Sequence, residues 1–456
     1  MVILTKRLSL FVSLSLLVLI AIFIGNSLRA EVFNPQSFTL SNGLQVVLVP
    51  NNRAPIVTLI VYYQVGAMDE PPGKSGLAHF LEHLMFKGRT KLGPGRYSTL
   101  VARIGGRSNA FTSQDYTGYI TTFAAEHIDL ILQLEAARMM GLELALEDIE
   151  TERNVVLEER LSRVDKSPQQ QLSEQAAAAL YANHPYRNPI VGWEHEIKTL
   201  THADLMSFYR TWYVPNNSVI VISGGTTIDK IKPIIERYFG ILPAHKLPKR
   251  TNLIEPPKNT ERIIKLSHSR VAQPSWSRRY LAPSHGVGDK TQIFALEVLA
   301  EILSGGNSGR LYRRLVVEQA VAIHAGAWYS PSKRGPGLFG FYGTPRPGRS
   351  LDEIETAIGS EISELLKYGV TDKEVHDAIN RLRADAVFAR DSLSSPPRII
   401  GNALMNGQTL IEIETWPDRI NGVTKAMITS SARKVFKVGG GITTRLTPIR
   451  QVENKM

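Results

Sequence analysis

The sequence contains no cysteine among its 456 residues, which excludes disulfide bonds, thiolate zinc sites and a cysteine nucleophile. It also lacks a recognisable nucleic-acid-binding motif, and no basic helix is interleaved with aromatic residues. Residues 1–245 contain 22 Lys and Arg against 22 Asp and Glu, so the whole excess of the net charge of +11 lies in residues 246–456. We interpret this excess as a solvated basic face, with no nucleic-acid partner.

The N-terminus has the order of a secretory signal. Two basic residues precede an uncharged apolar run from Leu8 to Ile24, and small residues suited to cleavage follow up to Ala30. The run is just short of the roughly 20 residues that a membrane span needs, so a retained anchor is the alternative to a cleaved signal. In both cases residues 1–30 predict export. An exported chain without cysteine suits a bacterial periplasm, with attachment to the inner membrane if the segment is retained.

The rest of the chain predicts two similar domains, because its length exceeds one ordinary core and 43% of its residues are hydrophobic. Strand patterns, amphipathic helices and a long charged helix follow one another in residues 31–241. A proline-punctuated basic segment, residues 242–257, is the predicted linker to a second domain, residues 258–456. In that second domain we expect strands near 261–266, 275–282 and 321–343, and helices over 290–304, 351–367 and 372–390. The fold class is therefore α+β with mostly antiparallel sheets.

Residues 79–83 read HFLEH within a predicted helix from Gly76 to Phe86. On a helix, His79 and His83 lie one turn apart on the same face, with Glu82 beside them. Two imidazoles at this spacing can bind one tetrahedral zinc ion. The alternative is a solvated or capped histidine pair, but the flanking residues are apolar, and buried histidines need partners.

A third ligand must come from another element, and the segment "LEDIETERNVVLEERLSRVD" predicts a long charged helix that can supply a carboxylate. Glu152 and Glu159 are two helical turns apart and share one face, so one can bind metal while the other supports it. Spacing alone does not choose between these two and the other glutamates nearby, which are Glu143, Glu147, Glu150 and Glu158.

The HxxEH sequence, followed 76 residues later by Glu159 within "ETERNVVLEER", resembles the pitrilysin/insulinase family of zinc peptidases. The likeness is greatest to bacterial relatives of the mitochondrial processing peptidase β subunit. It also rests on "SNGLQVVLVPN", "IGGRSNAFTSQDYTGYITTF" and "DLMSFYRTWYVPNNSVIVISGG". The resemblance implies two homologous domains, the second inactive, that together form half of a clam-shell.

The same resemblance implies the roles of the site residues. His79, His83 and Glu159 would bind one Zn²⁺ per chain, Glu82 would act as general base, and Glu152 would support the ligands. Zinc activates a water molecule and polarises the scissile carbonyl, and Glu82 takes the proton of that water. The implied activity is that of a zinc metalloendopeptidase acting on peptides or unfolded protein segments.

Substrate and partner are also implied by the resemblance. An edge strand with Asn109, Ala110 and Phe111 would hold a peptide substrate as an added strand. Relatives carry an arginine and a tyrosine seven residues apart in the second domain, where this chain has Val316 and Ile323. A homologous peptidase-like subunit is therefore expected to supply that pair, although three nearby residues are candidate substitutes: Tyr312, Arg314 and His324.

Two alternative functions remain at this point. The first is a non-catalytic scaffold or peptide-binding subunit of a related complex. The intact set of four residues (His79, Glu82, His83 and Glu159) argues against it, because a scaffold has no physical need of all four. The second is a zinc hydrolase acting on something other than peptides, and the possible substrate-pairing edge strand argues against that.

Overall fold

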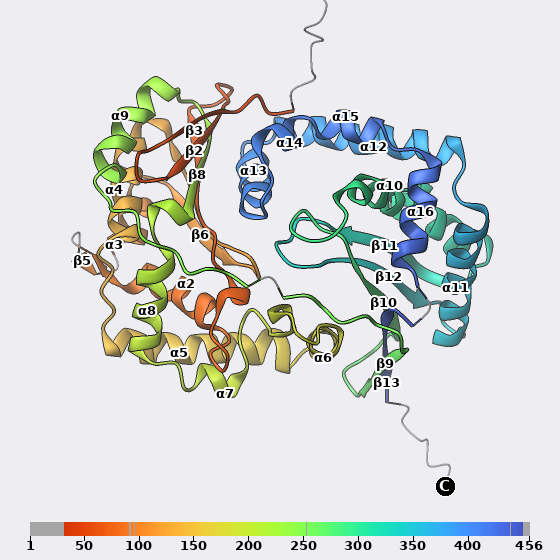
Figure 1. Cartoon of the computed structure of the whole chain (residues 1–456). Helices are drawn as coiled ribbons and strands as arrows, with labels where there is room; N and C mark the ends of the chain where they lie inside the picture. Colours follow the sequence, from red (N-terminus) through yellow and green to blue (C-terminus); the bar gives the residue numbers. More distant parts are fainter. Residues whose placement is uncertain (1–31, 91–92, 95, 252, 438, 450–456) are drawn as a thin grey trace, which may run out of the picture.

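The structure is a computed structural model that describes residues 32–90, 93–94, 96–251, 253–437 and 439–449. The predicted signal or anchor, residues 1–30, lies outside the described residues. Figure 1 shows two halves, each with one large sheet and helices packed on it. This architecture confirms the predicted α+β fold. Within the described ranges no helix is long and apolar enough to cross a membrane.

The first sheet has six strands, in which β2 and β8 are parallel and all other neighbours are antiparallel. Its central strands are buried on both faces, so β3 reads IVTLIVYY and seven of its eight residues are buried. Such strands show continuous apolar runs in place of alternation. In spatial order the strands are β1 (Gln36–Thr39), β2 (Gln45–Pro50), β8 (Ser218–Gly224), β3 (Ile56–Tyr63), β7 (Thr117–Ala124) and β6 (Arg107–Thr112).

The helices of the first half pack on this sheet and on one another. They are α2 (Leu77–Lys87), α3 (Arg96–Arg103), α4 (Ile128–Met139), α5 (Leu146–Arg160), α6 (Pro168–Leu180), α7 (Glu194–Ile197), α8 (His202–Trp212) and α9 (Ile228–Phe239). The predicted long charged helix is present, but α5 passes at its end into a π-helical turn, Leu161–Asp165. Arg160 holds this turn, because its guanidinium contacts Asp165 at 3.3 Å and Glu174 at 2.9 Å.

The second half repeats the order of the first. Its strands, in spatial order, are β9 (Arg262–His268), β13 (Gly441–Pro448), β10 (Ser275–Ala282), β12 (Gly337–Pro345) and β11 (Ala322–Ser330). Only β9 and β13 are parallel, as β2 and β8 are in the first sheet. Its helices are α10 (Ile293–Ser304), α11 (Leu351–Tyr368), α12 (Asp372–Asp391), α13 (Ser395–Met405), α14 (Leu410–Glu414), α15 (Trp416–Asn421) and α16 (Lys425–Val435). By this order, α10 and α12 are the counterparts of α2 and α5.

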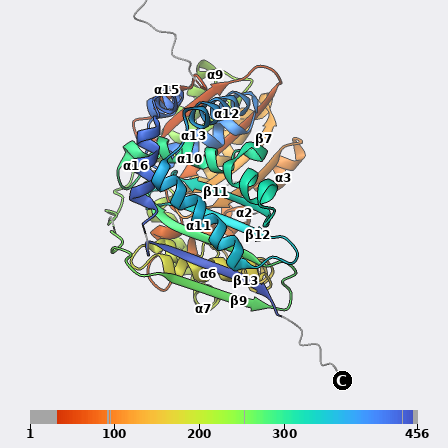
Figure 2. The same cartoon turned by 90° about the vertical axis from the view of Figure 1, so that its right-hand side faces the viewer.

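Each half contributes one helix to the other. Helix α13 packs on β3 and β8 of the first sheet, where Ile400 joins the apolar cluster that contains Tyr62 and Val221. Helix α6 packs in turn on β9 and β13, and these elements lie together in Figure 2. Both contacts bury apolar side chains between the two halves.

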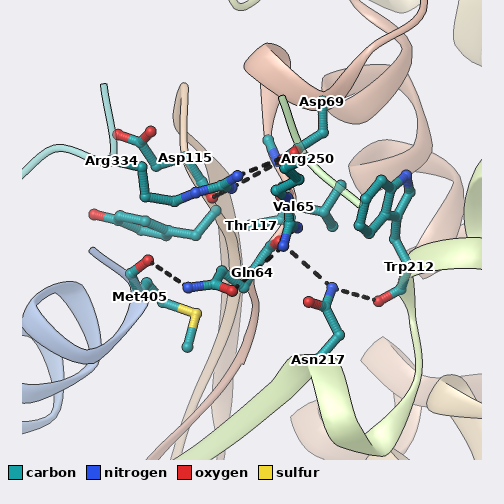
Figure 3. A network of polar contacts seen from close by, with 12 residues as sticks. Gln64, Val65, Asp69, Asp115, Thr117, Trp212, Asn217, Arg250, Arg334 and Met405 are labelled. Atoms are coloured by element: carbon teal, nitrogen blue, oxygen red, sulfur yellow. Dashed lines mark hydrogen bonds and ion pairs between the residues drawn. The ribbon is translucent and has the colours of Figure 1, made fainter. Parts of the chain in front are cut away.

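A polar network also joins the halves (Figure 3). Arg334, from the second half, contacts the Asp69 carboxylate at 3.0 and 3.2 Å and donates to the carbonyl oxygen of Asp115 at 3.0 Å. Arg250 donates to the same Asp69 carboxylate at 2.7 Å. Gln64 donates to the carbonyl oxygen of Met405, at the end of α13, at 2.9 Å.

The predicted linker, residues 242–257, has neither helix nor strand among its described residues. Hydrogen bonds nevertheless attach this segment to the first half. Besides the contact from Arg250, the Glu255 carboxylate accepts the backbone N–H groups of residues 182–184 at 2.6 to 2.8 Å. The division of the chain into domains at this segment stays a prediction.

Candidate metal centre

The helix that carries HFLEH is anchored at its start. Gly76 at the N-cap has φ 86°, and a Cβ there would lie 2.6 Å from the carbonyl oxygen of Val191, so only glycine fits. The Glu70 carboxylate accepts the backbone N–H groups of Gly76 at 3.0 Å and Ala78 at 2.8 Å. These contacts satisfy two N–H groups that a helix start leaves without intrahelical partners. Apolar residues on the rest of α2 enter the first core, which orients the polar face.

The three predicted ligands come together between α2 and α5. The ligand atoms of His79, His83 and Glu159 all lie within 4.8 Å of one another, and within the described ranges they form the only such group of three. His79 Nε2 lies 3.7 Å from Glu159 Oε1, and His83 Nε2 lies 3.3 Å from Glu159 Oε2. Two imidazoles and one carboxylate are a donor set for a catalytic zinc site, with one position left for water. The residues therefore fit the predicted metal.

The pKa values of the two histidines are shifted in opposite directions. Burial, together with the charge of neighbouring His83, lowers the pKa of His79. For His83, burial opposes protonation, but its contacts with Glu159 and Glu152 outweigh burial and raise the pKa. The contact with His83 holds the pKa of Glu159 below its usual value. The site thus joins a neutral imidazole, a more basic imidazole and an ionised carboxylate, and metal binding requires both histidines to be neutral.

Glu152 contacts the His83 imidazole on Nδ1, the nitrogen opposite the one that lies beside Glu159. Its Oε2 is 3.2 Å from His83 Nδ1, and its Oε1 is 2.9 Å from the Lys87 ammonium. The Glu152 side chain is 5% exposed, whereas that of Glu150 is 69% exposed. A buried carboxylate on Nδ1 orients the imidazole so that Nε2 points to the metal position.

Glu82 faces the same site without belonging to the three-ligand group. It is buried, and the Thr112 hydroxyl donates to its Oε2 at 2.6 Å. Burial raises the pKa of Glu82, while the hydrogen bond from Thr112 opposes that rise. A carboxyl group with a raised pKa beside a metal position is suited to accept and return a proton.

Asn109, Ala110 and Phe111 lie on β6, the edge strand of the first sheet, next to α2. They pair with Ile120, Tyr119 and Gly118 of β7, and within the described residues β6 has no neighbour on its other side. The N–H of Ala110 donates to the Asn109 side chain at 2.9 Å. The edge can therefore accept an added strand if the Asn109 side chain releases that N–H.

The structure shows three contacts at the site that the sequence analysis did not predict. Arg163 contacts Glu159 at 2.5 Å, Lys87 contacts Glu152, and Thr112 contacts Glu82. Arg163 lies four residues after Glu159, so helical spacing gives a usable signal for that contact. Lys87 of α2 contacts Glu152 of α5, and this contact depends on how the two helices pack. Thr112 is brought in by strand pairing, which no local spacing reveals.

The positions of the expected arginine and tyrosine are taken by Val316 and Ile323, whose side chains have no hydrogen-bond donor. Val316 is buried in a π-helical turn, Tyr312–Glu318, and Ile323 lies at the start of β11. Of the three candidate substitutes, the Arg314 guanidinium contacts Glu361 at 2.8 Å and Glu364 at 2.6 Å. Tyr312 packs against the second core, and His324 is exposed.

Two family sequence models match the chain: insulinase (peptidase family M16) over residues 45–193, and the peptidase M16 inactive domain over residues 199–382. The zinc protease PqqE of Helicobacter pylori is 30% identical over 389 residues, 84% of this chain and 86% of that protein. A probable mitochondrial-processing peptidase subunit beta of Arabidopsis thaliana is 24% identical, covering 87% of this chain and 75% of that protein. The crystal structure of a protease from Helicobacter pylori matches with a TM-score of 0.84 at 28% identity, covering 91% of this chain and 100% of that one.

All the predicted metal, base and supporting residues lie within the first of these two matched segments. The second matched segment begins before β8, which belongs to the first sheet, so the boundary between the sequence models does not coincide with the boundary between the sheets.

Proposed function

The chain belongs to peptidase family M16, the pitrilysin and insulinase family of zinc proteases, and on that premise we propose that it is the zinc-bearing subunit of an exported endopeptidase. The proposal rests on the close approach of His79, His83 and Glu159 to one another. Glu82 lies beside them and is not one of the three candidate ligands. A catalytic zinc site needs this division between ligands and base. The substrates are peptides or unfolded segments held along β6.

The division of labour within the site follows from its contacts. His79, His83 and Glu159 would hold one zinc ion, which supplies a Lewis acid and makes water a stronger nucleophile near neutral pH. Glu82 accepts the proton of the attacking water and gives it to the leaving amine. The Thr112 hydroxyl fixes the carboxylate of Glu82, and because Thr112 ends β6, it links the base to the substrate strand. Glu152 keeps His83 oriented.

We propose further that a homologous chain completes the site. Val316 and Ile323 have no side-chain donor, and Arg314 is engaged by two carboxylates. Removing one oxyanion donor costs about 10²–10³ in rate, so the chain alone should be a poor peptidase. Export to a periplasm, by a signal or anchor in residues 1–30, is the setting that the N-terminal sequence supports.

The same observation at Val316 and Ile323 favours the second candidate, a non-catalytic peptide-binding subunit. Peptide hydrolysis by the zinc-loaded chain, alone and mixed with a homologous chain bearing the arginine and tyrosine, separates the two. We expect little cleavage by the chain alone and strong cleavage by the mixture, without a second zinc ion. Peptide binding without cleavage in either sample would support the scaffold. Full activity of the purified single chain would refute the shared site.

A further inference from the structure

A cavity lined by acidic and aromatic side chains lies in the second half of the molecule, away from the candidate metal centre. It has a volume of about 420 Å³ and lies beside α10 and α12, with residues of α13, α14 and the segment before β1 completing its wall. Because α10 and α12 are the counterparts of α2 and α5, the cavity lies beside the second half's equivalents of the two helices that carry the candidate metal ligands.

Two acidic side chains line this cavity, Glu297 in the middle of α10 and Asp385 on α12. One carboxylate oxygen, Oε2, accepts the indole N–H of Trp416 at 3.0 Å. Burial raises the pKa of Glu297 to about 7, and the hydrogen bond from Trp416 only partly opposes this. No salt bridge to Glu297 exists among the described residues. The Glu297 side chain is half-buried in the wall of an open cavity, and a bound cation would stabilise a partly desolvated carboxylate that has no other cation beside it.

The rest of the wall has the features of a site for an organic cation. The aromatic rings of Phe33 and Trp416 line it together with the apolar Leu382 and Ile413. Two amide side chains, Asn402 and Gln408, add polar contacts. Among the described residues that line the cavity there is no lysine or arginine, although the excess of basic residues lies in this half of the chain. Aromatic faces attract ammonium groups, and a carboxylate does so more strongly.

We propose that this cavity binds an ammonium group carried on an apolar body, with Glu297 as the counter-ion and the rings of Phe33 and Trp416 around the apolar part. An inorganic metal ion fits less well, because the only group of three possible ligands within the described ranges is the one on α2 and α5. An anionic ligand finds no lysine or arginine among the described residues of the wall, and burial lowers the pKa of His285 to about 4, so this side chain is uncharged near neutral pH. The volume suits a ligand of small-molecule size or the terminal residue of a peptide.

Calorimetric titration of the zinc-loaded full chain with 2-phenylethylamine, and with 2-phenylethanol as its uncharged counterpart, tests the proposal. We expect saturable binding of the amine and binding of the alcohol weaker by about tenfold or more, as the loss of one buried ionic contact requires. Glu297→Gln should weaken amine binding by a similar factor. Its matched control is Glu301→Gln, on the same helix but paired with Arg381, which should bind as the unaltered chain does.

The dependence on Glu297 also excludes binding of the amine at the metal centre, because that residue lies in the other half. Trp416→Phe, which keeps an aromatic ring, serves as a second variant in case Glu297→Gln fails to fold, and it should retain a preference for the amine over the alcohol. Equal affinity for amine and alcohol, or unchanged amine binding by a folded Glu297→Gln chain, would overturn the proposal.

A second arm of the experiment distinguishes the source of the ammonium group. The zinc-loaded Glu82→Gln chain, which should not cleave, is titrated with Phe-Ala-Ala and with its N-acetylated form. If Phe-Ala-Ala binds in a Glu297-dependent way and its N-acetylated form does not bind, the occupant is the amino terminus of a peptide. Binding of 2-phenylethylamine without binding of either tripeptide identifies a free small amine. If none of the amine-bearing probes binds, the cavity is not an ammonium site.

Discussion

Glu152→Gln should lower the zinc affinity of the chain while leaving all three proposed ligands in place. In the structure Glu152 Oε2 lies 3.2 Å from His83 Nδ1, and the carboxylate also contacts Lys87 at 2.9 Å. A glutamine keeps the shape and one acceptor oxygen but removes the negative charge that makes the imidazole a stronger donor to the metal. Loss of such a supporting contact typically costs about 10–100-fold in metal affinity. That factor corresponds to about 1.4–2.7 kcal/mol.

The assay is competition for zinc against a chelator of known affinity, at fixed pH because the ligands bind metal only when deprotonated. Glu150→Gln is the matched control, since Glu150 lies on the same helix but is 69% exposed and contacts Arg153. Lys87→Gln should have a smaller effect, less than about fivefold, because an ion pair with a half-exposed lysine is screened by water. If Glu152→Gln binds zinc as tightly as the unaltered chain, Glu152 does not support His83 and the reasoning is wrong.

Three further predictions concern the ligand set, the linker and the contact between the halves. Glu159→Gln should abolish stoichiometric zinc binding in metal analysis while its exposed neighbour variant Glu158→Gln retains one ion per chain; equal zinc content would mean that the third ligand is misassigned. Burial raises the pKa of Glu255, but hydrogen bonds from Lys258 and three backbone N–H groups lower it to about 2. An unfolded glutamate has a pKa of about 4. The ionised Glu255 therefore stabilises the folded chain above about pH 4, and this contribution is lost as the pH falls towards 2. Glu255→Ala should therefore unfold more readily in urea at pH 7 and lose less stability on acidification, whereas an acid transition identical to that of the unaltered chain would contradict this. Arg334→Ala should lower the free energy of unfolding by about 1.5–3 kcal/mol, because the buried Asp69 loses one of its two arginine partners while Arg250 remains. The exposed Arg349→Ala should change it by less than about 1 kcal/mol. Similar values for both would show that the network in Figure 3 does not stabilise the contact between the halves.

The sequence predicted the elements that depend on local pattern. The HFLEH spacing placed His79 and His83 on one helix face, and the strands and helices of the second half begin within three residues of their expected positions at β9, β10, α10 and α12. These features follow from the periods of helix and strand, which local sequence records.

The choice among the glutamates of α5 could not be made in this way. Glu150 and Glu158 are exposed, whereas Glu152 is buried and Glu159 is half-buried, and this difference arises from how α5 packs on α2. Thr112 reaches Glu82 through the pairing of β6 with β7. The cavity at Glu297 likewise depends on helices distant in sequence. Contacts of this kind are set by tertiary packing, which residue spacing does not encode.

The most direct test of the central claim is peptide cleavage by the zinc-loaded chain and by Glu82→Gln, each mixed with the homologous partner and each with its zinc content measured. The account predicts one zinc ion per chain in both samples, and cleavage that falls by about 10²–10⁴ or more in the variant, because the amide cannot accept the proton of the attacking water. Near-normal cleavage by Glu82→Gln with its zinc in place would contradict the assignment of Glu82 as the base, and with it the proposed mechanism.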